Sequence, residues 1–560
     1  MDKHLKDIIN NHIPKLTDEI VNGYAVKEIQ FAEAFVDERL RCAEASFPEG
    51  LVYVDYRRVL PHEEYRQATE SRSGKPVFDV ARSDRYMVAY EFNYHGEKIV
   101  LHIYLPYVRD GGVITLKGAT FAVSPVLADK GISFGTNSAF VQVVRSKMTF
   151  NRDVYHYTAS GIRVEKVYVV SGKLHYRSEK KAEANGAPGL KTANTTVAHY
   201  LFGKYGVHES FRMFQGVEVV VGLPGEVNEE NYPFEIIDEE TGEVSSGWVV
   251  CGSMGHQPKA IKRKDWQPPQ VKIAVRYDDY KDSVIRSMVG GFFYVADLFP
   301  ERVDHLAAEG MDGSEDEIRL WRILLGKIIG GVSGGDGEVA RDINEHYNSL
   351  DLYIDEKTRR DLEKGDILVD NLYELLMILQ EKLSQSTIQE VDAISSMADK
   401  QLMVLRYMLS DINDKIFWML FSLHKKVAQG KELTMNDVRR TLQRQLSREM
   451  IMNLRNGGKH GEVSSISSPG DNKFFKITRN VVLQTDSSGI NRRGKKAPTD
   501  ESKFLHATQL EYGSVTVLPK SEPTGRQLNP HSRVDGEGNL VGRRSFAPII
   551  ENVQTMIRRR

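Results

Sequence analysis

Basic side chains gather in the last hundred residues of the chain, where their type suits contact with phosphate groups. Between Arg455 and Arg560 there are 18 Lys and Arg against 10 Asp and Glu, so the preceding residues carry about −10 of the total of −2. Five of these cations are separated by glycine and have Asp486 as their one acidic neighbour: Arg479, Arg492, Arg493, Lys495 and Lys496. A loop of this composition can approach a phosphate backbone closely and offer several cationic donors, which predicts nucleic acid as a partner. The alternative is a solvated basic loop without a ligand.

Motifs for self-sufficient chemistry are missing from the sequence. It has no His-Glu-x-x-His, no Gly-x-Ser-x-Gly, no Gly-x-Gly-x-x-Gly after a strand and no Asp-x-Asp-Gly-Asp triplet. The glycines after Ile329 follow an expected helix and lack the Gly-Lys-Ser/Thr of a phosphate loop. Cys42 and Cys251 are far apart, without a Cys-x-x-Cys pair, so neither a disulfide framework nor a structural zinc site is predicted. We therefore expect no catalytic residue and no metal site in this chain.

Composition predicts a multidomain protein of the cell interior. At 560 residues, 41% hydrophobic and 27% charged, the chain can form three or four domains with cores of ordinary size. The first residues lack the apolar segment of a signal peptide, and no apolar run reaches the 18 or so residues of a membrane span. We expect a protein of a reducing cytoplasm with no membrane contact.

Hydrophobic periodicity predicts an α+β organisation. Helix is expected over residues 1 to about 45, short strands over 51 to about 144, and a glycine-flanked hairpin around the Val-Ile-Thr-Leu run that starts at Val113. Residues 195–214 are typical of a short helix that is amphipathic on the surface; the alternative is a helix that opens a lobe-like domain, as in the family that the chain resembles below. The turn expected at Asp535-Gly536 reverses the chain near its end.

The region after Ser314 is predicted to be mostly helical as far as about Leu454. Ser314 and Glu317 have the spacing of a capping box, and one long helix is expected over residues 397–427. A last helix is expected to begin near Thr434 and to end at Gly457-Gly458, with an apolar stripe of Val438, Leu442, Leu446 and Met450.

The order of several segments resembles the N-terminal half of the β subunit of multisubunit DNA-directed RNA polymerases. The run TDSSGINRR, then KKAP, KFLHATQLEYG and LPKSEPTG is similar to the fork and rifampicin-pocket region of that family. The matching positions there are Arg492, Arg493, Leu505, His506, Thr508, Gly513, Pro519, Pro523 and Gly525. Upstream, the hairpin is similar to an early motif of the family at Val113, Ile114, Leu116, Gly118 and Val123. Ala507 departs from the family, which has proline after the histidine.

The resemblance implies a fold and a division into domains. It implies a protrusion-like α/β region over 1–150, a lobe-like domain over 151–290, a helical region completing the protrusion over 291–455, and a basic, irregular β-rich fork segment over 456–560. Because the chain is about half the length of a complete β subunit, it looks like the N-terminal piece of a split β, as in the polymerases of giant tailed bacteriophages.

The resemblance also implies an activity exerted only within a complex. The chain would contact template DNA and the RNA–DNA hybrid, while Mg²⁺ is bound by aspartates of a partner subunit. The implied partners are a C-terminal β fragment, β′ fragments, template DNA and nascent RNA, and the need for a promoter-specificity factor is left open. The implied nucleic-acid contacts are Arg479, Arg492, Arg493, Lys495, Lys496, Lys503, His506 and Arg526.

The implied location is the cytoplasm of the infected bacterial host, with packaging in the virion left open. Two other classes are compatible with a basic tail: a phage structural or DNA-packaging-associated protein, and a stand-alone nucleic-acid-binding factor. Neither explains a glycine-flanked hairpin followed, about 370 residues later, by the fork-like segments in the order of the polymerase family.

Overall fold

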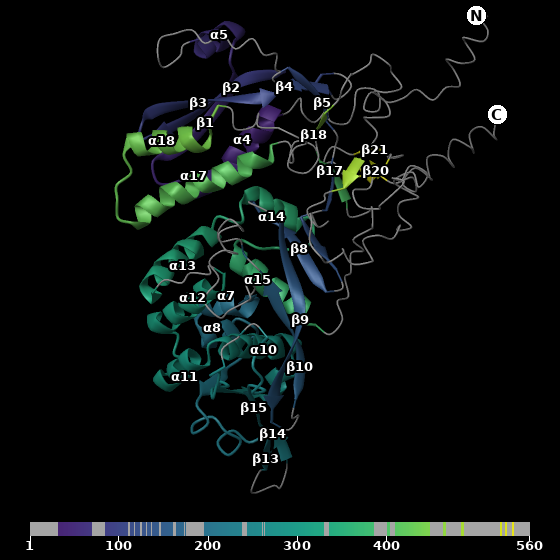
Figure 1. The fold of residues 1–560 in the computed structure, drawn as a ribbon, viewed down its shortest axis with the longest axis vertical. Coiled ribbons are helices and arrows are strands. Elements are labelled where there is room, and N and C mark those ends of the chain that lie inside the picture. The colour runs from purple at the N-terminus through teal and green to yellow at the C-terminus, as the bar shows by residue number, and fades with distance from the viewer. Residues whose placement is uncertain are drawn as a thin grey trace, which may run out of the picture. The chain divides into compact units, whose positions relative to one another are not determined.

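The computed structural model describes most of the chain before residue 449 and short strands after it. The described residues are 32–69, 84–109, 113–116, 118–123, 126–129, 131–135, 137–144, 147–160, 164–172, 174, 195–237, 244–259, 261, 264–329, 335–385, 400–403, 409–448, 463–465, 483–485, 527–528, 533–534 and 540–541. The chain forms two compact units, which we call unit 1 (Met1–Lys130, Asp355–Lys357 and Ala393–Arg560) and unit 2 (Gly131–Ile354 and Thr358–Asp392). Helices and several sheets are mixed in a multidomain α+β protein, as predicted (Figure 1). The four-domain division stays a prediction.

Unit 1 is built on the antiparallel sheet β1-β2-β3, with α4, α17 and α18 packed beside it (Figure 1). Its elements are α4 (Ala32–Ala43), η1 (Glu44–Ser46), β1 (Leu51–Arg58), α5 (Pro61–Thr69), β2 (Arg85–Tyr94), β3 (Glu97–Pro106), β4 (Val113–Leu116), β5 (Ala119–Val123), β6 (Val126–Asp129), β17 (Lys400–Met403), α17 (Ser410–Ala428), α18 (Met435–Gln445), β18 (Val463–Ser465), β19 (Leu483–Thr485), β20 (Gln527–Leu528), β21 (Arg533–Val534) and β22 (Leu540–Val541). Burial alternates along the second half of β2, where Tyr90, Phe92 and Tyr94 are buried, whereas the stretch from Met87 to Tyr90 is buried without a break.

The predicted helix over 397–427 is partly wrong. Residues Lys400–Met403 form strand β17, which pairs antiparallel with β6, and helix begins only at Ser410. The apolar run in this part of the sequence suits a strand as well as a helix, and pairing with a distant strand decides between them. The last helix does begin with a capping box of Thr434 and Asp437 but ends at Gln445, before the predicted glycines. Strands β21 and β22 pair antiparallel on either side of the predicted Asp535-Gly536 turn.

Unit 2 has a sheet in the order β11-β10-β9-β15-β16-β12, with β7 and β8 joined to β9. Its elements are β7 (Ile132–Phe134), β8 (Ser138–Gln142), β9 (Lys147–Ala159), β10 (Glu165–Gly172), β11 (Thr195–Thr196), α7 (Val197–Tyr205), α8 (Val207–Arg212), β12 (Val219–Gly222), β13 (Glu235–Ile237), β14 (Val244–Ser246), β15 (Trp248–Gly252), β16 (Lys272–Arg276), α9 (Tyr277–Tyr280), α10 (Ser283–Leu298), α11 (Pro300–Glu309), α12 (Glu315–Ile329), α13 (Asp336–Leu350), α14 (Glu356–Glu363, whose first two residues belong to unit 1) and α15 (Leu372–Ser384). Helices α10 and α15 pack on β10, and α7 contacts both of them and α12.

Helix α7 lies at the centre of unit 2. Every residue from Val197 to Gly203 is buried, so the prediction of an amphipathic surface helix is wrong. One of these buried residues is His199, whose two ring nitrogens both have a hydrogen-bond partner. Nε2 lies 3.0 Å from the Trp321 carbonyl oxygen, and Nδ1 lies 2.7 Å from Thr195 Oγ1. Because a carbonyl can only accept, Nε2 carries the proton and Nδ1 accepts from the threonine hydroxyl. The core is therefore organised around a neutral histidine.

The predicted capping box at Ser314 is only half formed. The Glu317 N–H donates to Ser314 Oγ at 3.4 Å, but the Glu317 carboxylate does not return to Ser314. It accepts instead from the backbone N–H groups of Val207 (2.8 Å) and Gly313 (2.7 Å) and from the indole N–H of Trp321 (3.3 Å). The side chain thus caps the neighbouring helix α8, because its fully buried carboxylate can satisfy three donors there.

Gly291 lets α10 approach α7 closely, which gives a testable consequence. A Cβ at this position would lie 2.7 Å from Ala198 Cβ, an atom that cannot rotate away, and 3.3 Å from Thr196 Oγ1. We expect Gly291→Ala to lower the free energy of unfolding by about 2 kcal/mol, measured by denaturant unfolding, because overpacking outweighs the gain in helix propensity. Gly337→Ala in α13 is the control, since a Cβ there meets nothing within 4 Å. Equal stability of the two variants would contradict this close packing.

Candidate nucleic-acid interface

The residues predicted to contact nucleic acid lie outside the described residues. This holds for all eight: Arg479, Arg492, Arg493, Lys495, Lys496, Lys503, His506 and Arg526. Their contacts therefore stay predictions. The structure does describe short strands within the same basic segment, and those strands show what holds the segment to the rest of unit 1.

The glycine-flanked hairpin forms as predicted and is extended by the basic segment. Strands β4 and β5 pair antiparallel, with Gly118 at a φ of +81° in the turn, where a residue with a side chain would be strained. Strand β18 then pairs with the free edge of β5, placing Val463 opposite Val123. The hairpin and the start of the basic segment are therefore one three-stranded sheet.

A second sheet ties the middle of the basic segment to the strand that follows the hairpin. In the order β17-β6-β19-β20, strand β19 runs parallel to β6, with Gln484 beside Val126. Strand β20 pairs antiparallel with β19, and Arg526 directly precedes β20 in the sequence. Two segments more than 350 residues apart, both of which carry the resemblance, are thus neighbours in the fold. This pairing was not predicted from the sequence, although the strand-length run VVLQT at 481–485 was a signal for strand β19 itself.

A charged clamp fixes the base of the hairpin to the β1-β2-β3 sheet. Asp84 Oδ2 accepts from Thr115 N–H at 2.7 Å and from Arg109 Nε at 2.9 Å, and Arg109 also donates to Thr115 Oγ1 at 2.8 Å. The Asp84 N–H in turn donates to the Thr115 carbonyl at 2.7 Å. Because four bonds join three residues, strand β4 is positioned firmly, and it pairs in turn with β5, the strand to which the basic segment adds β18.

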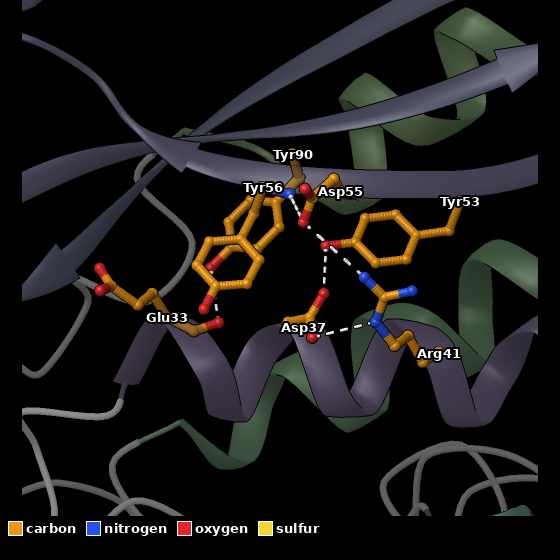
Figure 2. Close-up of polar contacts among 7 residues, drawn as sticks. All are labelled: Glu33, Asp37, Arg41, Tyr53, Asp55, Tyr56 and Tyr90. Atoms are coloured by element: carbon orange, nitrogen blue, oxygen red, sulfur yellow. Dashed lines mark hydrogen bonds and ion pairs between the residues drawn. The ribbon is translucent and has the colours of Figure 1, made fainter.

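Helix α4 is held on the sheet by a cluster of tyrosines and carboxylates (Figure 2). Asp37 lies between Tyr53 and Arg41, accepting from the phenol at 2.8 Å and from the guanidinium Nε at 3.1 Å. Burial, together with the bond to Asp37, raises the pKa of Tyr53 far above its ordinary value, so the phenol stays protonated. Tyr90 donates to the Glu33 carbonyl at 3.3 Å. These contacts join α4 to strands β1 and β2, so the cluster positions the helix.

The described residues offer neither a metal site nor a membrane-spanning helix. Within these ranges no three His, Cys, Asp or Glu side chains are grouped so that they could hold a metal ion. None of the described helices is both long and apolar enough to cross a bilayer. Cys42 and Cys251 are both buried and neither is in a disulfide, and burial raises the pKa of the Cys251 thiol, which disfavours the reactive thiolate.

Comparison with known protein families identifies the chain. Residues 3–544 match the family described as non-virion RNA polymerase subunit. No curated protein matches the sequence. The predicted role as a subunit of an RNA polymerase is confirmed at this level, in preference to a capsid or packaging role. Because the match covers nearly the whole chain, the protein belongs to the family of non-virion RNA polymerase subunits.

Proposed function

We propose that this chain is the N-terminal part of the β subunit in a split, multisubunit DNA-dependent RNA polymerase of a bacteriophage. The observation that carries the proposal is the pairing of β5 and β6 with β18 and β19. This pairing brings together the hairpin segment and the basic segment, the two parts of the sequence that resemble β. The match to a family of RNA polymerase subunits supports the same assignment. In this proposal the hairpin supports the basic segment as it contacts nucleic acid.

The proposed chemistry is shared between chains. This subunit supplies cationic contacts to template DNA and to the RNA–DNA hybrid, mostly at phosphates, as transcription of any sequence requires. The catalytic Mg²⁺ is bound by a β′ fragment, and a further polypeptide supplies the rest of β. The assembled enzyme acts in the cytoplasm of the infected host.

Isolation of the tagged chain from infected cells tests the assignment to β. We expect co-purification of one chain with an Asn-Ala-Asp-Phe-Asp-Gly-Asp type motif and of another that completes β, both identified by mass. Recovery of the chain alone, or with capsid proteins only, would overturn the proposal.

The paired arginines of the basic segment give the second test. In the assembled enzyme, Arg492→Ala with Arg493→Ala is expected to reduce the salt dependence of DNA binding. The magnitude of the slope of log K against log salt should fall by about 1.8, at about 0.9 per lost duplex phosphate. Arg543→Ala with Arg544→Ala is the control, because it removes an equal pair of charges from the same segment outside the proposed contacts. Normal transcription by the first variant at all salt concentrations would show that these arginines do not bind nucleic acid.

A further inference from the structure

Helix α18 presents a row of arginines that the basic C-terminal segment does not include. Its buried side consists of Val438, Thr441 and Leu442. The opposite side is exposed and polar throughout: Arg439, Arg440, Gln443 and Arg444. Arg440 and Arg444 are four residues apart and therefore neighbours on the helix surface, and Arg439 with Gln443 forms the adjacent row. The row from 439 to 444 covers about 7.5 Å of helix axis at 1.5 Å per residue.

This helix is held rigidly in unit 1. Its start is fixed by the reciprocal capping box of Thr434 and Asp437. Just before it, the Leu433 carbonyl accepts from the Tyr94 hydroxyl of β2 at 2.8 Å, and just after it the Arg448 carbonyl accepts from the Tyr104 N–H of β3 at 3.0 Å. Both ends are therefore bonded to the sheet, with α18 beside β3 in Figure 1. The arginines project from an element that has little freedom to move.

The charge of these arginines is not neutralised within the described part of the chain. None of Arg439, Arg440 and Arg444 forms an ion pair there. Asp437, the acidic residue of α18, is already bonded to Lys426 Nζ at 2.6 Å and to the Thr434 hydroxyl at 2.8 Å. Residues 425–448 contain seven Lys and Arg against two Asp and Glu, whereas the whole chain carries −2. Like charges at i and i+4 destabilise a helix by about 0.2–0.5 kcal/mol per pair, so an anionic partner would relieve this repulsion.

Positive charge near α18 also acts on the neighbouring strand β3. The pKa of His102 on β3 is lowered, first by burial and then by the positive charges of Arg448 and Arg57. The helix dipole accounts for a cation only in the last turn, at Arg444, and Arg439 and Arg440 form no ion pair with any described residue that would account for them. The exposed face also has no apolar residue, whereas the centre of a protein–protein interface is normally apolar. Charge without apolar surface fits a phosphate backbone better than a protein.

We propose that the exposed face of α18, formed by Arg439, Arg440 and Arg444, binds the phosphate backbone of duplex DNA. Contacts of this kind hold DNA without reading its sequence. The choice of duplex DNA rests on the proposed function, because a DNA-dependent polymerase must hold duplex DNA along its length. The surface is separate in sequence from the proposed contacts of residues 479–526.

The test uses the assembled polymerase with a triple variant, Arg439→Gln, Arg440→Gln and Arg444→Gln. Binding to duplex DNA is measured by fluorescence anisotropy over a range of KCl concentrations. The magnitude of the slope of log K against log salt is expected to fall by about 2.7, at about 0.9 for each of three phosphates. The matched control is Arg212→Gln, Arg319→Gln and Arg341→Gln, which removes three exposed arginines from unit 2 and is expected to leave the slope unchanged.

The outcomes separate this inference from the proposed function. An unchanged slope in an intact, transcribing complex overturns the α18 surface and leaves the proposed function in place. An equal fall in the control overturns it as well, since net charge would then explain the effect. If the triple variant loses partner subunits but still binds duplex DNA normally, the face contacts a protein instead. If only its binding of single-stranded RNA changes, the face does not bind duplex DNA. If the unaltered chain co-purifies with no polymerase subunit, the proposed function fails, whereas the α18 surface is then judged on the binding of the full chain itself.

Discussion

Replacing Glu317 by alanine is expected to lower the free energy of unfolding of unit 2 by about 4 kcal/mol. The carboxylate is fully buried and is the acceptor for the N–H groups of Val207 and Gly313 and for the Trp321 indole. Each buried donor left without an acceptor costs about 1–3 kcal/mol, and bonds to a charged group lie toward the upper end. Urea unfolding followed by tryptophan fluorescence measures the loss.

Two further variants show whether the bonds or the position cause the effect. Glu315→Ala removes an exposed carboxylate from the same first turn of α12 and is expected to cost less than about 1 kcal/mol. Glu317→Gln keeps the shape but turns an NH₂ toward one of the donors, so its loss should fall between those of the other two variants. A Glu317→Ala variant as stable as Glu315→Ala would mean that the three donors find other acceptors.

Local signals were enough to predict several elements of the fold. The Val-Ile-Thr-Leu hairpin needed only a β-branched run and a glycine that tolerates positive φ, and both are visible in the sequence. Helix α18 began where Thr434 and Asp437 predicted it, because a capping box acts over three residues. Contacts over long sequence distances were not predictable in this way. Strand β17 depends on β6, about 270 residues earlier, and the Glu317 carboxylate on Val207 in another helix.

The sequence predicted that the chain binds phosphate groups, but it indicated less well which surfaces do so. A surplus of basic residues after Arg455 indicated phosphate binding, but those side chains lie outside the described residues. Strand β19 had a signal in the run VVLQT, but its pairing with β6 could not be predicted, since nothing in so short a run identifies a partner more than 350 residues away. The arginines of α18 were visible as Arg-Arg-x-x-x-Arg, but only the apolar stripe of that helix was predicted from the sequence. Their importance depends on the lack of an ion pair to any described residue, which only a structure can show.

Acidification is expected to destabilise unit 2 through His199. Complete burial lowers the pKa of this imidazole to about 3, against about 6.5 in the unfolded chain. Between these two values the unfolded chain binds a proton that the folded chain does not, so stability is full above about pH 6.5 and is lost as the pH falls toward 3. The loss attributable to this residue is about 1.4 kcal/mol per pH unit, or about 2.7 kcal/mol from pH 6.5 to 4.5.

Comparison with His199→Gln isolates this term from the titration of other groups. The variant is expected to be less stable at pH 7, because Gln cannot reproduce both contacts to Thr195 and Trp321. Its free energy of unfolding should fall less steeply as the pH is lowered, because unfolding of the variant takes up nearly one proton fewer. His305→Gln, at a residue that is 73% exposed, should keep the slope of the unaltered protein. Denaturant unfolding at half-unit intervals between pH 4.5 and pH 7.5 gives the three slopes. Parallel curves for His199→Gln and the unaltered protein would mean that His199 takes up its proton equally in the folded and unfolded states, which its complete burial should prevent.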